Sequence, residues 1–341
     1  MTASNHSDAP ISDQADFRDD PGRLAELPPV EIPSGSFVVQ LFVIPAVVVL
    51  VVIMVWLLFG KLAGGERDAM EYVRLIRSSS GSWRSAYELA SLIQNDPKLG
   101  SDPRLLGELT DLLAAELDKS GDPKLIQYLE LTLGAFQTRE ATTSSGQVVD
   151  PIEVLSRGLE PRQDVQIRMA AAASLAKQAA RLEGKLDDPK AVEALARAST
   201  DPVVELRQIA AYALGFFGGE PAADALRERI RGDDDRFVRY NAAVALGRRG
   251  DDAATATLRE MLSTADLDRL IERPTASEKE NKIEAVQHEA IEAISNSITA
   301  GSTAFAKGFE AELNALTRSG LAGVRTQAKE ILKKLQSTPA S

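Results

Sequence analysis

The chain has 341 residues, of which 44% are hydrophobic and only 5% aromatic, and it contains no cysteine. Such a chain can bury a long core, but the core must consist mainly of small aliphatic side chains, which favours helices. The absence of cysteine excludes disulfides, thiolate metal sites and a cysteine nucleophile. The net charge of -11 and the lack of any block of Lys or Arg argue against nucleic acid as a partner.

The N-terminal residues 1–36 are acidic and show no helical or strand periodicity. They contain seven Asp or Glu side chains but only two basic ones, Arg18 and Arg23, and they are rich in Ser and Pro. Segments with little hydrophobicity and a high net charge cannot bury enough apolar surface to fold. We therefore expect residues 1–36 to form a disordered acidic tail.

The run from Phe37 to Phe59 contains 23 residues without a charge. As a helix rising about 1.5 Å per residue, it would cross a hydrocarbon core of about 30 Å. The sequence therefore predicts one transmembrane helix in contact with the lipid bilayer. A cleaved signal peptide is the alternative, but the long acidic leader and the length of the run argue against it.

The basic residues around this run predict its direction. Two precede it, and four follow it closely: Lys61, Arg67, Arg74 and Arg77. Because basic residues are enriched on the cytoplasmic side of membrane helices, we expect a single-pass cell-membrane protein with its N-terminus outside. Residues 60–81 would then be a juxtamembrane helix or linker, and the remainder of the chain would be cytoplasmic.

A short motif recurs along residues 82–336. It is clearest in LRQIAAYALG from Leu206 and VRYNAAVALG from Val238. Weaker copies begin at Leu125, Ile167, Val286 and Val324. The apolar and small residues of each copy form one stripe of a helix, and the copies lie 32 to 48 residues apart, which is typical of repeated helix pairs.

This motif resembles HEAT repeats, especially the HEAT-like type also found in phycobilisome lyases. The resemblance implies an all-α fold, an α-solenoid of HEAT-like helix pairs, here preceded by one transmembrane helix and a disordered N-terminal tail. Residues 337–341 would form a C-terminal tail. Members of the HEAT family mostly serve as scaffolds and adaptors, so the resemblance implies protein binding.

Two kinds of residue mark the expected helix ends. Asp-Pro steps predict helix starts, because Asp accepts from free amides and Pro suits the first turn. These steps begin at Asp96, Asp102, Asp122, Asp150, Asp188 and Asp201. Gly215 and Gly247 close two motif copies, where we expect left-handed residues that end helices.

Two segments, 137–150 and 263–281, interrupt the pattern of helix pairs. We interpret both as loops. The alternative is that the second segment, which is charged, contacts a partner.

Four arginines recur at one position of the motif: Arg168, Arg207, Arg239 and Arg325. The resemblance to HEAT-like repeats implies that they pair with acidic groups and carbonyls of adjacent repeats, and Asp164, Asp201 and Asp234 are near in sequence. We therefore interpret them as a structural ladder and not as a binding site. Gln287 occupies the same position and should break the ladder.

The sequence offers no catalytic, cofactor or metal site. His288 is the only histidine of the folded part, so a two-histidine metal site cannot form, and we interpret His288 as an exposed helix position and not as a catalytic residue. The run Asp233 to Asp235 lacks the layout of a calcium loop and is better explained by helix capping. Phosphate-binding glycine motifs do not occur. We therefore expect no enzyme and no cofactor.

These features predict a membrane-anchored scaffold or adaptor at the cytoplasmic membrane face. Its partner would be a protein, with another membrane protein as one option, bound on the concave face of the array. Second-helix residues would make the contact: Arg227, Glu228, Arg259 and Glu260. The alternatives are an accessory subunit of a transport or secretion assembly, and a bilin-lyase-like protein implied only by the resemblance.

Overall fold

A computed structural model describes residues 49–55, 68–78, 83–182 and 186–337 of the chain. It divides into two compact units, residues 1–66 and residues 67–341. In the first unit, the described residues 49–55 are helical. The predicted acidic tail, residues 1–36, and residues 338–341 of the predicted C-terminal tail lie outside the described residues.

The prediction of a single-pass membrane protein requires correction. Within the described ranges, no helix has both the length and the apolar character needed to cross a bilayer. Residues 37–48 and 56–59 of the predicted span lie outside those ranges, and the seven helical residues 49–55 extend only about 10 Å. The bilayer contact and the cytoplasmic placement of the repeats both depended on a spanning helix, so they receive no support.

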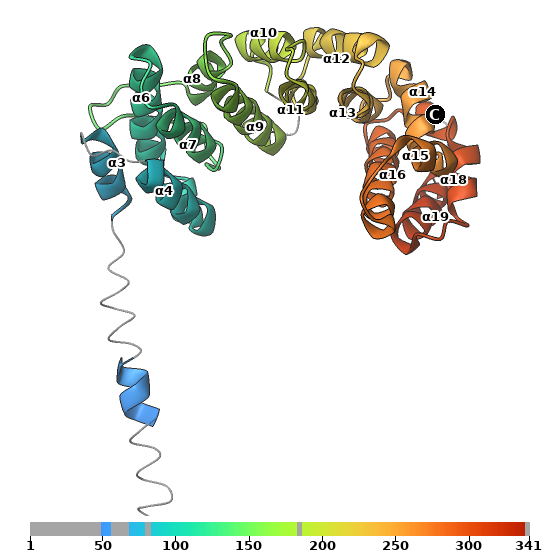
Figure 1. Ribbon diagram of the computed structural model, residues 1–341, viewed down its shortest axis with the longest axis horizontal. Helices are drawn as coiled ribbons and strands as arrows, with labels where there is room; N and C mark the ends of the chain where they lie inside the picture. Colours follow the sequence, from blue (N-terminus) through green and yellow to red (C-terminus); the bar gives the residue numbers. More distant parts are fainter. Residues whose placement is uncertain (1–48, 56–67, 79–82, 183–185, 338–341) are drawn as a thin grey trace, which may run out of the picture. The chain divides into compact units, whose positions relative to one another are not determined.

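The second unit consists of helices stacked in two layers (Figure 1). The inner layer, on the concave side, contains α4 (Trp83–Asn95), α7 (Pro123–Leu133), α9 (Val165–Arg181), α11 (Val204–Leu214), α13 (Arg236–Gly247), α16 (Ala276–Thr299) and α19 (Ala322–Ser337). The outer layer contains α3 (Ala69–Arg77), α6 (Pro103–Asp118), α8 (Pro151–Gly158), α10 (Pro189–Ala198), α12 (Glu220–Gly232), α14 (Thr255–Leu262) and α18 (Glu310–Leu316). Short helices lie between them: α5 (Pro97–Gly100), η2 (Asp252–Ala254), α15 (Thr264–Leu270) and α17 (Thr303–Lys307).

The predicted all-α class is confirmed for the described part of the chain, where only two isolated β-bridges interrupt the helices and loops. The array begins earlier than predicted. Val73 and Ile76 of α3 are buried in the same core as the later helices, and α3 packs on α4 and α6. The described part of the segment predicted as a juxtamembrane helix or linker, residues 60–81, therefore contributes a helix to the array.

Most of the Asp-Pro steps start helices as predicted. The side chains of Asp96, Asp102, Asp122, Asp150 and Asp188 each accept a hydrogen bond from a backbone amide of the first turn. Asp201 is the exception: α11 begins three residues later, and Val203 stands at its N-cap without a side-chain bond. The carboxylate of Asp201 accepts from the Val203 amide, at 2.9 Å, and also pairs with Arg168 of the preceding repeat.

The two motif glycines are not left-handed, so this prediction was wrong. Gly215 has φ -62°, and Gly247 is the last residue of α13; the left-handed residues come slightly later, at Gly219 and Gly250. Packing explains the motif glycines instead. A Cβ on Gly215 would lie 2.7 Å from the Cβ of Ala245, and one on Gly247 would lie 2.7 Å from a Leu258 methyl group.

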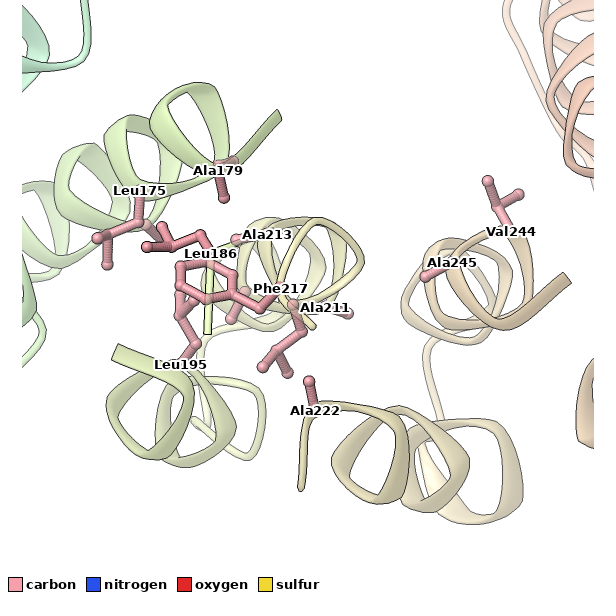
Figure 2. Close-up of a cluster of buried hydrophobic side chains, with 14 of the residues drawn as sticks. Leu175, Ala179, Leu186, Leu195, Ala211, Ala213, Phe217, Ala222, Val244 and Ala245 are labelled. Atoms are coloured by element: carbon pink, nitrogen blue, oxygen red, sulfur yellow. The ribbon is translucent and has the colours of Figure 1, made fainter. Parts of the chain in front are cut away.

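Small side chains let the layers approach each other closely, as Figure 2 shows for the middle of the array. Phe217, which follows α11, is fully buried beside Leu195 of α10 and Ala222 of α12. The backbone amide of the next residue, Gly218, donates a hydrogen bond of 3.1 Å to the carbonyl of Leu186, which lies between α9 and α10. One aromatic side chain therefore fills the space between both layers where the alanines leave room.

The two interruptions of the motif are structured. In the first, residues 137–150, the Thr142 amide donates to the Pro103 carbonyl (2.9 Å), and the Ser144 amide donates to Glu108 of α6 (2.7 Å). In the second, residues 263–281, α15 buries Leu267 before α16 begins. Both segments therefore pack on the array, and a partner contact by the second stays a prediction.

Candidate functional site

The ladder arginines connect consecutive repeats. Arg207 donates three hydrogen bonds to the carboxylate of Asp233, at 2.9, 3.0 and 3.3 Å. It also donates to the carbonyls of Asp201 (3.0 Å) and Pro202 (3.3 Å). The Asp233 side chain is only 2% exposed. Hydrogen bonding to this carboxylate raises the pKa of Arg207 above its ordinary value. Arg168 pairs with Asp201 in the same way, one repeat earlier.

The other ladder positions keep part of this pattern. Arg239 and Arg325 donate to carbonyls five and six residues upstream, at 2.5 to 3.5 Å. Gln287, where the arginine is missing, is fully buried and donates to the Leu262 carbonyl (3.2 Å) and the Thr264 hydroxyl (2.9 Å). Each of these side chains donates hydrogen bonds to oxygen atoms in the segment before its own helix or before a neighbouring helix.

The four residues predicted to bind a partner lie on the outer layer, not on the concave face. Arg227 and Glu228 belong to α12, and Arg259 and Glu260 belong to α14 (Figure 1). The concave placement is therefore corrected, because the second helix after each motif copy packs behind the inner layer. Whether these residues bind a partner stays a prediction.

All four are already engaged within the array, Glu228 through a looser ion pair with Arg229 at 3.8 Å. Arg227 forms ion pairs with Glu220, Asp224 and Asp251, and these hydrogen bonds raise its pKa. Arg259 pairs with Glu312 at 3.0 Å. Glu260 accepts from the Tyr240 hydroxyl, at 2.6 Å. Burial is the larger cause that raises the pKa of the Tyr240 hydroxyl, and the hydrogen bond to Glu260 is the second cause.

Two further motif positions face the concave side in the middle of the array. They lie five and nine residues after the ladder arginine. The fifth position holds Ala173, Tyr212 and Val244 in α9, α11 and α13, and the ninth holds Lys177, Phe216 and Arg248. Because α11 packs on α9 and α13 at its sides and on α10 and α12 behind, its remaining stripe faces the concave solvent. In Figure 2, Val244 likewise points to the side of α13 away from α12.

These positions bring aromatic and cationic groups together. The rings of Tyr212 and Phe216 meet edge to face, with centroids 4.9 Å apart. The guanidinium of Arg248 lies 5.4 Å from the Phe216 centroid. Tyr212 is 48% exposed, and Lys177 is exposed on the neighbouring helix. We call the side chains of Lys177, Tyr212, Phe216 and Arg248 the inner patch.

Charge is distributed unequally between the layers around this patch. The inner helices α9, α11 and α13 contain six Lys or Arg residues and one acid, Glu205. The outer helices α8, α10 and α12 contain the same number of Lys or Arg residues but five acids. The three inner helices are therefore less acidic than the three outer helices, although two of their arginines, Arg168 and Arg207, are paired with Asp201 and Asp233 of the loops.

Sequence reasoning missed the inner patch because it stopped at the motif. The ninth position lies just after the motif's final glycine, so its alternation of Lys177, Phe216 and Arg248 appears only when the repeats are aligned further. Tyr212 and Phe216, four residues apart in a chain with few aromatics, were the other available signal.

A second concave feature is a shallow groove of about 750 Å³ between α16 and α19. His288 lies in it, half exposed, next to the side-chain amide of Gln327 and 3.8 Å from Glu292. Within the described ranges, no group of three or more His, Cys, Asp or Glu side chains could hold a metal ion. The described residues of the groove therefore form no constellation that points to a particular chemistry.

Residues 152–240 and 205–273 match the family model for HEAT repeats. HEAT repeats are thus present in the part of the chain that carries the inner patch, and they suggest protein–protein interaction. A comparison with curated proteins found no match.

The chain is also similar to solved structures at low identity. Human deoxyhypusine hydroxylase in complex with glycerol is 19% identical, over 79% of this chain and 85% of that chain, with a TM-score of 0.31. An engineered protein is 19% identical, over 80% and 97%, with a TM-score of 0.34. The complex of CpcE and CpcF of phycocyanin lyase from Nostoc sp. is 16% identical, over 80% and 96%, with a TM-score of 0.31.

Proposed function

We propose that this chain is a protein-binding scaffold or adaptor whose contact surface is the inner patch. The observation that supports this most is the exposure of Tyr212, a large aromatic side chain at the centre of the concave layer. Aromatic and arginine side chains dominate the binding energy of protein interfaces. The inner patch contains both, on rigid helices that are held in place by the ladder.

The neighbours of Tyr212 strengthen this proposal. At the same motif position, the adjacent helices carry Ala173 and Val244, whose side chains are much smaller. Val244 is buried and Ala173 is half-buried, so Tyr212 is the exposed side chain of the three. Tyrosine also supplies a large contact area while losing little conformational entropy.

We do not assign a reaction to this surface. The polar groups of the inner patch are an ammonium, a guanidinium and a phenol, and such a set lacks a paired base and nucleophile. We also do not extend the proposal to a transport assembly or to a bilin lyase, because no contact among the described residues favours either.

Site-specific photo-crosslinking in cells tests the proposal. Full-length protein would carry p-benzoylphenylalanine in place of Tyr212, and the matched control would carry it in place of Glu228. Glu228 is more exposed than Tyr212 but lies on the outer helix α12. We expect a reproducible crosslinked protein from position 212 only, and we expect that protein, once purified, to lose binding to Tyr212→Ala.

Crosslinks from position 228 alone would favour the outer-layer residues and contradict the proposal. Failure of the captured protein to bind the purified chain would contradict it as well. Equal binding of that protein to wild type and Tyr212→Ala would show that the inner patch is not the contact surface.

A further inference from the structure

We propose that the inner patch recognises an acidic, extended segment of its protein partner. This inference rests on the proposed function and adds the chemistry of the partner. Carboxylates of the segment would pair with Lys177 and Arg248, and an apolar side chain between them would pack on Tyr212.

The charges support an acidic partner because the two cations of the patch are not neutralised. No carboxylate among the described residues lies within ion-pair distance of Lys177 or Arg248. The outer layer differs: Lys190 pairs with Glu153, and Arg197 pairs with Glu193. Cations without an intramolecular partner attract complementary charge from a ligand.

Arg248 is also held in a defined position. Its guanidinium lies over the Phe216 ring, and its Nε is buried without a hydrogen-bond partner among the described residues. An arginine fixed on an aromatic face loses less entropy when it binds a carboxylate, and its planar fork suits two parallel hydrogen bonds. The charge of Arg248 and the fixed orientation of its guanidinium therefore both favour a carboxylate as the ligand.

The dimensions of the patch favour an extended segment. Helices packed at about 8 to 10 Å place the outermost of three neighbours about 20 Å apart. An extended chain advances about 3.3 Å per residue, so about six residues cross from α9 to α13. Because the Arg248 guanidinium reaches over Phe216, next to α11, one acidic residue near the end of such a segment would meet Lys177 and another nearer its middle would meet Arg248 and pass Tyr212.

A nucleic acid is the other anionic ligand, and the charges disfavour it. Binding a phosphate backbone requires many basic contacts, whereas the inner patch offers two cations. The chain's charge of -11 would repel a long polyanion but would tolerate a short segment with few carboxylates.

Peptide selection on the purified full-length protein tests the inference. A phage-displayed library of random peptides about ten residues long would be selected against wild type. The enriched peptides would then be measured by fluorescence anisotropy against Lys177→Glu combined with Arg248→Glu. The matched control combines Lys190→Glu and Arg197→Glu, which makes the same charge change on the outer layer.

We expect enriched peptides rich in Asp and Glu with at least one apolar residue. Their affinity should fall about tenfold or more with the inner-patch variant and much less with the control. Lys177→Glu alone, at an exposed position, gives the same test if the double variant does not fold. Circular dichroism of every variant would establish that the helices are intact.

Enrichment of basic or uncharged peptides, or no enrichment, would overturn the inference. Equal losses with the inner and outer variants would overturn it too, because they would show a general effect of charge. Tighter binding of a labelled single-stranded oligonucleotide through Lys177 and Arg248 would assign the patch to nucleic acid. If crosslinking at position 212 succeeds while any of these results is obtained, the proposed function stands and only the acidic partner is excluded.

Discussion

The inner and outer layers of the middle repeats contain the same number of basic residues, but they use them differently. On the outer helices, basic side chains meet acids within their own layer, as Arg197 meets Glu193. On the inner helices, the ladder arginines reach buried carboxylates of the next repeat, as Arg207 reaches Asp233. Lys177 and Arg248 then remain without a carboxylate among the described residues.

This difference separates two tasks within one helix. The first turns of α9 and α11 hold neighbouring repeats together through the ladder, and positions five and nine residues later do not contribute to it. At those later positions, Tyr212 and Lys177 are exposed, so these two side chains are available to a partner. A repeat array can thus keep its architecture while its concave surface changes.

The largest expected effect comes from breaking the ladder. Asp233→Ala leaves the Arg207 guanidinium, on a side chain only 12% exposed, without its carboxylate. We expect the free energy of unfolding to fall by about 3 kcal/mol, because an uncompensated buried charge is costly. Urea unfolding measures this, with Asp234→Ala as the exposed neighbouring control, expected within about 0.5 kcal/mol of wild type. Equal effects of the two variants would show that the ladder does not hold the repeats.

The next effect concerns the outer layer where residues 137–150 pack on it. A Cβ on Gly107 of α6 would lie 2.4 Å from backbone atoms of Thr142, which cannot move without displacing that segment. We expect Gly107→Ala to destabilise by about 2 kcal/mol through overpacking. Gly232→Ala, in open space on α12, should instead be neutral or stabilise by up to about 1 kcal/mol. A neutral Gly107→Ala in thermal melts would mean that the segment is not docked.

A smaller, pH-dependent effect arises at Glu130 on α7. Its carboxyl group is fully buried, and neither oxygen has a hydrogen-bond partner among the described residues; burial raises its pKa well above 4.5. Below pH 4.5 the group is protonated in both states. Above pH 4.5, the Glu130 carboxyl group ionises in the unfolded state before it does so in the folded state. The free energy of unfolding therefore falls as pH rises towards the pKa of the folded state.

Glu130→Gln removes this dependence without changing the shape of the side chain. We expect the stability of the variant relative to wild type to rise above pH 4.5, with a slope of at most about 1.4 kcal/mol per pH unit. Chemical denaturation across a pH series measures it, with the exposed Glu193→Gln as control. Parallel pH profiles for wild type and Glu130→Gln would contradict a raised pKa.

The smallest effects on stability should come from the exposed lysines. Lys177→Ala on the inner layer and Lys190→Ala on the outer layer should each change the free energy of unfolding by less than about 0.5 kcal/mol. Their effects on binding should differ, since only Lys177 belongs to the inner patch. A clear loss of stability with Lys177→Ala would mean that this residue serves the fold after all.

Much of the fold could be predicted from the sequence because the helix signals are local. The Asp-Pro steps depend on a carboxylate and an amide two or three residues apart, so five of the six behaved as predicted. Asp201 differs in that α11 begins only at Val204: its carboxylate accepts from the Val203 amide and also binds a distant arginine, Arg168. The prediction that Gly215 and Gly247 are left-handed was wrong because neighbouring helices, and not the backbone angles of these residues, require glycine there.

The candidate site could be predicted less well. Charged residues such as Arg227 and Glu260 suggested a surface, but their partners Asp251 and Tyr240 come from other segments. Which layer is concave depends on how the helices stack, and no single repeat contains that information. The inner patch also combines three repeats, so it appears only after they are aligned in space.

Differential lysine acetylation tests most directly whether the concave layer is the binding surface. Full-length protein would be labelled alone and in complex with the protein captured at position 212, and the modified lysines would be quantified by mass spectrometry. We expect Lys177 to become protected several-fold in the complex, while Lys190, which is also exposed but lies on the outer layer, does not change. Protection of Lys190 with full labelling of Lys177 would contradict this expectation.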